Sequence, residues 1–175
     1  MALLIFTGIA ALVFCTDVLL KQGIEETLLP GEERKLIGER VLLRKVYNKG
    51  AMLNLLEGRP DILKGISALL GSAALLYDAV LLGKPRRFMK KTGMMLFTGG
   101  AFSNIFDRFL RGRVIDYIGF QTRWPKLTAI TYNLADFAIF TGTVLVMISR
   151  FVSFVSRKLC VMLSIVKRTP SPDQE

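Results

Sequence analysis

The chain has 175 residues, and it contains no histidine and only two cysteines. Without histidine it cannot build a Ser-His-Asp triad, a Cys-His pair or the common histidine-based zinc sites. Cys15 and Cys160 lie in apolar stretches near opposite ends of the chain, which is typical neither of a disulfide framework nor of a metal cluster. Any catalytic chemistry must therefore use carboxylates, lysine, hydroxyl groups or an isolated thiol.

Charged residues are almost absent from four long blocks of the sequence, at residues 2–16, 65–83, 92–106 and 127–149. A helix that crosses a bilayer needs about 20 mostly apolar residues. A soluble helical bundle is the alternative, but each of its helices would carry a polar face. We therefore predict an all-α membrane protein, a single domain over residues 1–175, whose four transmembrane helices lie at residues 2–20, 63–83, 88–106 and 127–149.

The region between the first two spans differs in composition from the blocks around it. Residues 41–47 are β-prone and partly alternate, and Asn48-Lys49-Gly50 is a turn signal. We therefore predict a small extracytoplasmic β-cradle within residues 22–60.

Positive charge sets the expected orientation. The link at residues 84–91 contains five basic residues and no acidic one, so the positive-inside rule places it in the cytoplasm. The basic C-terminal tail, residues 157–175, agrees with this placement. We expect a multi-pass protein with both termini inside and the two longer loops outside.

The net charge of +10 is compatible with nucleic-acid binding, but the apolar residues are not spread as in a soluble core. We expect no nucleic-acid partner. The positive charges outside the cytoplasmic link are expected to face anionic membrane lipids and the aspartates of the site.

Three aspartates fall within the predicted spans: Asp17, Asp78 and Asp136. An ionisable side chain at mid-membrane costs about 2.5–3.5 kcal/mol on insertion scales, so each is a candidate for function. Asp78 is close enough to Arg86 or Arg87 for a structural ion pair. Asp17 precedes Lys21 by four residues, so the two share a helix face and we expect a supporting ion pair.

Two asparagine-aspartate pairs frame the loop between the third and fourth spans. Asn104 precedes Asp107 by three residues and Asn133 precedes Asp136 by three, so each pair shares one helical face. Asp116 lies between them among apolar neighbours. We expect Asp107, Asp116 and Asp136 to gather at one membrane surface, with Asp136 about nine residues, or roughly 13 Å, into its helix.

Clustered carboxylates without histidine favour aspartic peptidase chemistry. Two carboxyls held close in a low dielectric cannot both ionise, so one acts as general base while the other donates a proton. Plain pairing with Arg108, Arg111 and Arg113 is the structural alternative, and it suits Asp107 better than Asp136.

Two other functions stay open. A carrier or scaffold could use the aspartates as a proton or cation relay, although that function expects charges throughout the membrane depth. A Ser-Lys dyad of Ser67 and Lys64 is conceivable, but nothing near them in the sequence lowers the pKa of the lysine.

Five motifs, kept in order and spacing over about residues 13–150, resemble those of bacterial lipoprotein signal peptidase, signal peptidase II. The motifs are Asp17-x-x-x-Lys21, Asn48-x-Gly50-Ala51, Gly99-Gly100-Ala101-x-x-Asn104-x-x-Asp107-Arg108, Gly112-x-Val114-Ile115-Asp116-Tyr117 and Tyr132-Asn133-x-Ala135-Asp136.

The resemblance implies a four-span aspartic endopeptidase of the bacterial cytoplasmic membrane, active on the extracytoplasmic side. Such an enzyme removes the signal peptide of prolipoproteins before the diacylglyceryl-modified cysteine, without metal or cofactor, and we expect a monomer. Carried over by position, Asp116 and Asp136 become the catalytic pair, with Asp107 and Asp136 as the alternative pair. The supporting residues become Asn104, Asp107, Arg108, Asn133, Asp17 and Lys21, and the substrate-binding residues become Asn48 and Gly50.

The chain departs from the usual family pattern at several positions. Ser103 replaces a glycine, Tyr117 and Tyr132 replace phenylalanines, and Phe137 replaces a small or hydroxyl residue; Gly50-Ala51-Met52-Leu53 stands for Gly-Ala-Ala-Phe. None of these is a proposed catalytic side chain, so we expect them to affect substrate preference more than activity.

Overall fold

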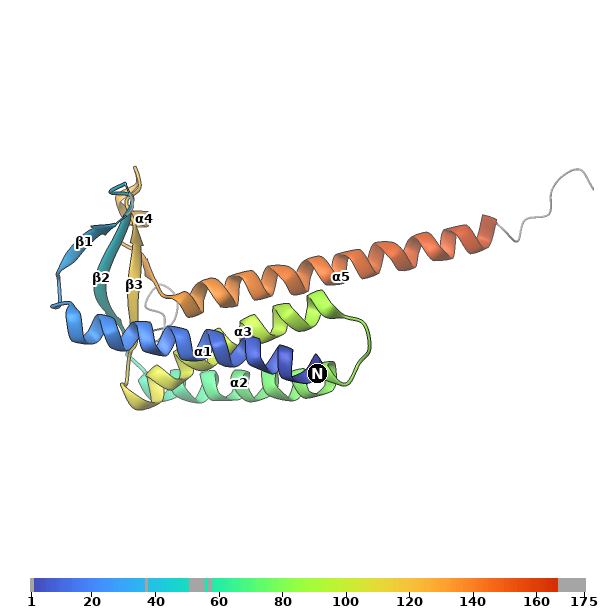
Figure 1. Cartoon of the computed structure of the whole chain (residues 1–175), viewed down its shortest axis with the longest axis horizontal. Coiled ribbons are helices and arrows are strands. Elements are labelled where there is room, and N and C mark those ends of the chain that lie inside the picture. The colour runs from blue at the N-terminus through green and yellow to red at the C-terminus, as the bar shows by residue number, and fades with distance from the viewer. Residues whose placement is uncertain (1, 37, 51–55, 57, 167–175) are drawn as a thin grey trace, which may run out of the picture.

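The computed structural model of the chain describes residues 2–36, 38–50, 56 and 58–166. Four long helices run side by side or cross at shallow angles, and a small twisted sheet stands across one end of them (Figure 1). The helices are α1 (Ala2–Thr27), α2 (Pro60–Leu82), α3 (Phe88–Leu110) and α5 (Leu134–Val166). The α2–α3 turn and the N-terminus lie at the end away from the sheet (Figure 1).

Three helices within the described residues are long and apolar enough to cross a membrane. They are Leu3–Thr27 in α1, Pro60–Leu82 in α2 and Leu134–Met162 in α5. Helix α3 is less apolar, and it packs against each of the other three long helices. Its buried residues include Lys91, Ser103, Asn104 and Asp107, and these polar side chains lower its hydropathy below that of the other three long helices.

Glycines let α3 approach its neighbours closely. A Cβ atom added to Gly100 would lie 2.5 Å from the backbone oxygen of Ala135 in α5, and one added to Gly93 would lie 2.8 Å from the backbone oxygen of Gly142. A Cβ on Gly99 would lie 2.5 Å from the backbone oxygen of Ala10 in α1. Small residues at helix contacts are typical of packing inside membranes. There the hydrophobic effect does not drive helices together, and close van der Waals contact between backbones stabilises their association instead.

The sheet has four antiparallel strands in the order β1-β2-β3-β4. Strands β1 (Glu33–Leu36) and β2 (Val41–Asn48) come from the region where a β-cradle was predicted. Strands β3 (Val114–Phe120) and β4 (Thr131–Tyr132) come from the loop between α3 and α5, which was not predicted to contribute. The cradle therefore joins both long loops, and Asp116 lies in its third strand.

A small apolar core attaches the sheet to the helices. Ile24 and Leu28, at the end of α1, pack with Ile115 and Tyr117 of β3. Helix α1 thus continues beyond residue 20, the expected end of the first span, because its last two turns bury apolar side chains against the sheet.

The last long helix begins later than predicted. Residues Pro125–Thr128 form the short helix α4, and Thr131 and Tyr132 pair with Gly119 and Ile118 of β3. Helix α5 therefore starts at Leu134, and the expectation that Asp136 lies nine residues into the helix is wrong because it lies in the first turn. Part of the predicted basic tail, residues 167–175, and the predicted family positions 51–53 lie outside the described residues.

The close contact of α3 with α5 predicts that Gly100→Ala forces the two backbones apart. We expect a loss of about 1–3 kcal/mol in the free energy of unfolding, the usual cost of overpacking, measured by thermal or denaturant unfolding in detergent micelles. The matched control is Gly65→Ala in α2, where nothing lies within 4 Å of the added Cβ. Equal stability of Gly100→Ala and the wild type would contradict the close packing.

Candidate active site

The N-terminus of α5 is capped by two hydrogen bonds between Asn133 and Asp136, one in each direction. Asn133 precedes the helix, and its side-chain Oδ1 accepts a hydrogen bond from the backbone N–H of Asp136 at 2.9 Å. In return the backbone N–H of Asn133 donates to Asp136 Oδ2 at 3.1 Å. This is the arrangement of a capping box, with Asn and Asp in the places of Ser and Glu. It fixes the Asp136 carboxylate at the first turn.

Asn133 also joins Asp136 to the other candidate carboxylate. Its side-chain Nδ2 donates to Asp116 Oδ1 at 2.6 Å and to Asn104 Oδ1 at 3.2 Å. Asn104 Nδ2 donates to Asp136 Oδ1 at 2.9 Å. The two carboxylates, from β3 and α5, are therefore held together by the amides of Asn133 and Asn104.

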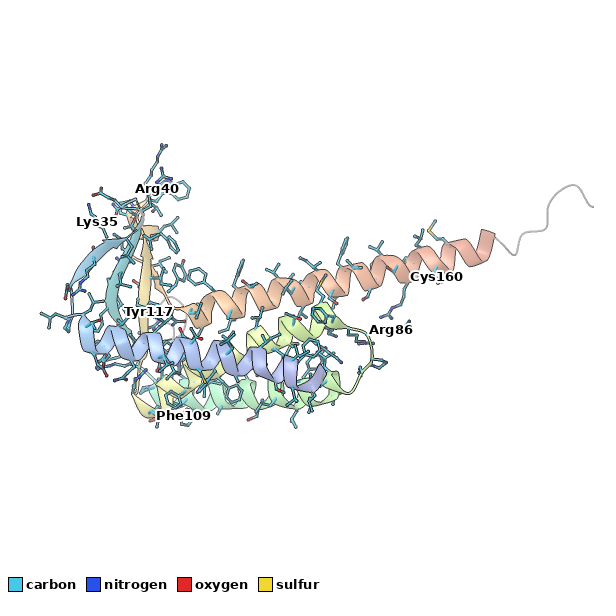
Figure 2. The ribbon with its side chains drawn as sticks, in the orientation of Figure 1. Lys35, Arg40, Arg86, Phe109, Tyr117 and Cys160 are labelled. Atoms are coloured by element: carbon cyan, nitrogen blue, oxygen red, sulfur yellow. The ribbon has the colours of Figure 1, made fainter. Side chains whose placement is uncertain are left out.

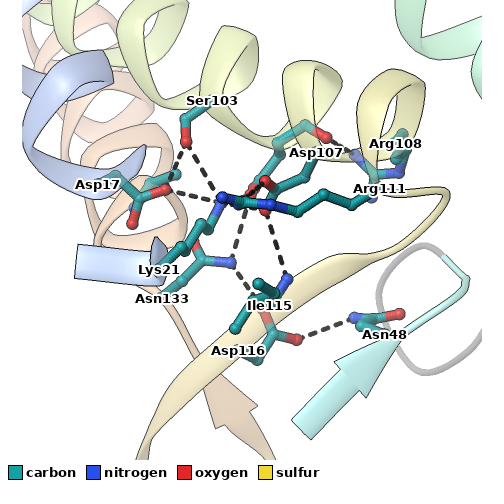
Figure 3. A network of polar contacts seen from close by, with 12 residues as sticks. Asp17, Lys21, Asn48, Ser103, Asp107, Arg108, Arg111, Ile115, Asp116 and Asn133 are labelled. Carbon is teal, nitrogen blue, oxygen red and sulfur yellow. Dashed lines mark hydrogen bonds and ion pairs between the residues drawn. The ribbon is translucent and has the colours of Figure 1, made fainter. Parts of the chain in front are cut away.

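The second oxygen of Asp116 faces the end of β2. Asn48 Nδ2 donates to Asp116 Oδ2 at 3.1 Å, while Asn48 Oδ1 accepts from the backbone N–H of Gly50 at 3.0 Å (Figure 3). Asn48 and Gly50 thus form a tight turn whose first side chain contacts the carboxylate.

Asp116 is buried, whereas Asp136 is partly exposed. Burial raises the pKa of Asp116 to about 6, and the negative charge of Asp136 acts in the same direction. The hydrogen bonds from Asn48 and Asn133 stabilise the ionised form and limit the rise. Asp116 therefore changes protonation close to neutral pH, where a general acid or base works best.

A fully buried ammonium group lies behind the carboxylates. Lys21 Nζ is 2.7 Å from Asp17 Oδ2 and 3.0 Å from Asp107 Oδ2, and none of these three side chains is exposed. It also donates to Asn104 Oδ1 at 2.9 Å. The predicted Asp17–Lys21 ion pair is confirmed, and its ammonium connects α1 to Asp107 of α3 (Figure 3). Through Asn104 the ammonium is also linked to Asp136.

Two hydroxyl groups complete the surroundings of Asp17. Ser103 Oγ donates to Asp17 Oδ2 at 2.5 Å, and Tyr117 OH donates to Asp17 Oδ1 at 3.0 Å. Burial raises the pKa of Tyr117, and the nearby Asp17 carboxylate adds to the rise, so the hydroxyl stays protonated. Because Tyr117 OH also accepts from the backbone N–H of Leu134 at 3.1 Å, it ties β3 to the start of α5.

Sequence reasoning did not assign contacts to Ser103 and Tyr117, which it treated only as departures from a family pattern. Their hydroxyl groups are visible in the sequence, but their common partner Asp17 lies 86 and 100 residues away along the chain. No spacing rule links residues so far apart.

Asp107 and Arg108 are neighbours in the sequence but have different partners. Asp107 pairs with Lys21 and, at 2.5 Å, with Arg111, rather than with its neighbour Arg108. Arg108 instead donates to the backbone oxygens of Asn104 at 3.2 Å and Gly50 at 3.4 Å, and its Nε is buried without a partner among the described residues.

The expected pairing of Asp78 with Arg86 or Arg87 is wrong. Asp78 is buried, and its Oδ2 accepts a hydrogen bond from Thr98 Oγ1 of α3 at 2.6 Å. This hydrogen bond joins α2 to α3, and no ion pair links Asp78 to either arginine among the described residues. Asp78 is therefore separate from the carboxylate cluster.

The described residues contain no group of three or more His, Cys, Asp or Glu side chains placed to hold a metal ion. The polar cluster consists of carboxylates, amides, hydroxyls and cations that are hydrogen-bonded or ion-paired to one another, apart from Arg108 Nε.

Comparisons with known proteins identify relatives of the chain. The family profile described as signal peptidase (SPase) II matches residues 9–152. A lipoprotein signal peptidase of Syntrophomonas wolfei is 38% identical over 144 residues, which is 82% of this chain and 90% of that protein. One from Moorella thermoacetica is 31% identical over 140 residues, 80% of this chain and 88% of that protein.

The fold has solved neighbours as well. A bacterial membrane enzyme determined by the in meso method matches with a TM-score of 0.72 at 23% sequence identity, covering 82% of this chain and 85% of that chain. A second structure of a bacterial membrane enzyme matches with a TM-score of 0.69.

The family profile and the named relatives place the chain in the class of membrane aspartic peptidases. Since the profile match extends over well more than half of the chain, the chain belongs to the signal peptidase II family. The resemblance inferred from the five motifs is confirmed.

The bridging hydroxyl of Tyr117 predicts a specific loss of stability. Tyr117→Phe removes a donor to Asp17 and the acceptor for the Leu134 N–H, so we expect the free energy of unfolding to fall by about 1–2 kcal/mol. The matched control is Tyr132→Phe, because the Tyr132 hydroxyl has no hydrogen bond recorded in the described part of the chain. If both variants lose the same stability, the hydroxyl bridge is not the cause.

Proposed function

We propose that this signal peptidase II removes the signal peptide from prolipoproteins by cleaving before a diacylglyceryl-modified cysteine, with Asp116 and Asp136 as its catalytic pair. The observation that carries the assignment is the bridge made by Asn133: its side-chain Nδ2 donates to Asp116 Oδ1, and its backbone N–H donates to Asp136 Oδ2. The names of the relatives, lipoprotein signal peptidases, support the substrate class.

The proposed reaction is hydrolysis of one peptide bond. One carboxylate removes a proton from a water molecule, and the water oxygen attacks the scissile carbonyl carbon. The other carboxyl donates its proton to the amide nitrogen as the C–N bond breaks, which yields a new carboxyl terminus and a free amine on the modified cysteine. The proton taken from water restores the pair for the next cycle.

The surroundings of the two carboxyls suggest their roles. Asp136 lies in the first turn of α5, where the helix dipole and the Asn133 N–H favour a negative charge. Asp116 is the more buried, with a pKa raised to about 6. Asp136 is therefore proposed as the base that activates water, and Asp116 as the acid.

Asp107 is the less suitable partner for Asp136. Its two oxygens are already paired with the cations of Lys21 and Arg111, and it is fully buried. With both oxygens engaged by cations, the carboxylate has no free oxygen to take a proton from water. We assign Asp107 the role of holding Lys21 in place.

We further propose that α3 is the fourth span, because it packs among the three apolar helices and has the same length as α2. The basic α2–α3 turn would face the cytoplasm, and the carboxylates would lie near the extracytoplasmic surface. A prolipoprotein anchored there by its lipid would present its cleavage site at the same depth.

Substitution tests the catalytic pair. Asp116→Asn and Asp136→Asn keep the shape of the side chain but cannot exchange a proton, so each should lower the cleavage rate by a factor of about 10² to 10⁴ or more. The assay is cleavage of a diacylglyceryl-modified prolipoprotein by purified enzyme, with the unmodified precursor as the substrate control. The matched control variant is Asp78→Asn, another buried aspartate, which should stay active. Wild-type turnover by either site variant would refute the assignment.

The raised pKa of Asp116 predicts the pH dependence. If Asp116 must be protonated to donate, kcat/KM falls as pH rises through about 6, because this constant reports the free enzyme. The pH profile of cleavage measures this directly. A rate that instead rises through pH 6 would reverse the roles of the two carboxyls.

A further inference from the structure

A cleft lies at the end of the molecule away from the aspartates. It has a volume of about 870 Å³ and is formed by the start of α3, the residue before it, and the far half of α5. Figure 1 shows why it exists: α5 diverges from the bundle and runs on past the α2–α3 turn. The lining residues are Arg87, Lys90, Ser149, Arg150, Ser153, Phe154, Arg157, Lys158 and Val161.

The lining is strongly cationic. It includes five basic side chains and no acidic one, and none of the five forms an ion pair with another described residue. Lys90 lies 5.2 Å from the ring centre of Tyr77, and Lys158 lies 5.8 Å from that of Phe154. Mutual repulsion of these charges would be relieved by an anion in the cleft.

The distance of the cleft from Asp136 along α5 is close to the thickness of a membrane. Arg157 follows Asp136 by 21 positions, or about 32 Å along the helix axis, and the hydrocarbon core of a bilayer is about 30 Å thick. If Asp136 lies at one membrane surface, Arg157 and Lys158 lie at the other. This step rests on the proposed depth of Asp136 and not on its catalytic role.

The surroundings of the cations are apolar. Phe151, Phe154, Val155 and Leu159 on α5 and Phe88 on α3 are all exposed. A free phosphate ion or a nucleic acid has no apolar chain that could bury these exposed side chains. A phospholipid has both a phosphate, which can bind the cations, and two acyl chains, which can pack against the apolar side chains. Basic residues beside apolar helix surface favour anionic lipid, at about 1 kcal/mol for each Lys or Arg near the surface.

We propose that this cleft binds the headgroup of an anionic phospholipid, whose phosphate is held by Arg87, Arg157 and Lys158 and whose chains lie along α5. The bound lipid fills the wedge between α3 and α5. It therefore fixes the second half of α5, which has no other helix of the described chain beside it (Figure 2).

The test uses the purified full chain in detergent and measures retained lipid by native mass spectrometry. The probes are phosphatidylglycerol and phosphatidylcholine with identical acyl chains. Wild type should retain the anionic lipid about tenfold more strongly than the zwitterionic one. This preference is smaller than the full electrostatic attraction that three cations near the surface can exert on an anionic lipid. The variant R87Q/R157Q/K158Q should lose this preference.

The control variant removes three charges from the sheet end of the molecule, where Figure 2 shows Lys35 and Arg40. K35Q/R40Q/K126Q should keep the preference, because all three residues are exposed and far from the cleft. Retained preference in the cleft variant, or equal loss in the control, would overturn the proposal.

Two further measurements keep the test decisive. The variant R87K/R157K retains the charges and should retain the lipid, and size-exclusion chromatography checks that each variant is folded. If the triple variant does not fold, R157Q alone should reduce the preference. Inorganic phosphate should not displace the lipid; displacement would indicate a site for free anions instead. Because binding is measured without cleavage, failure here leaves the catalytic assignment untouched.

Discussion

The buried ammonium of Lys21 is the interaction on which the site depends. An ion taken out of water costs several kcal/mol, and it is tolerated only where opposite charges and hydrogen bonds surround it. Asp17 and Asp107 provide the charges, and Asn104 and Ser103 the hydrogen bonds. Since these partners come from α1 and α3, the two helices must meet at this depth and in this rotation for the ion to be satisfied.

Shared hydrogen-bonding atoms pass this constraint on to Asp116 and Asp136, the proposed catalytic pair. Asp17 Oδ1 accepts from Tyr117 of β3 and from the backbone N–H of Ala135 at 3.2 Å, so the same carboxylate that holds Lys21 positions both the third strand and the start of α5. Asn104 links the ammonium to Asp136. Buried ion pairs are weak evidence for stability. Their role in this site is to restrict the position of Asp116 relative to Asp136.

Much of the site could be predicted from sequence because its residues recur at helical spacings: Asn104 with Asp107, and Asn133 with Asp136. The long apolar blocks located the helices in the same way. What spacing does not reveal is pairing across the chain. Residues 127–133 are apolar enough to extend the last helix, but Tyr132 pairs with β3 instead. The cap formed by Asn133 and Asp136 marks the true helix start, and their spacing in the sequence was used only to place them on one helical face.

Helix α5 links the two ends of the molecule. Its first turn holds Asp136, whose negative charge the helix dipole favours, and its far half carries Arg150, Arg157 and Lys158. With 33 residues it is about 50 Å long, so hydrophobic length alone does not fix its position in a bilayer. The polar groups at both ends of the helix must fix its position in the bilayer. At the proposed membrane depth, a helix held at one end by its internal cap and at the other by cations at the membrane surface keeps its first turn, and with it the carboxylate pair, at a constant depth.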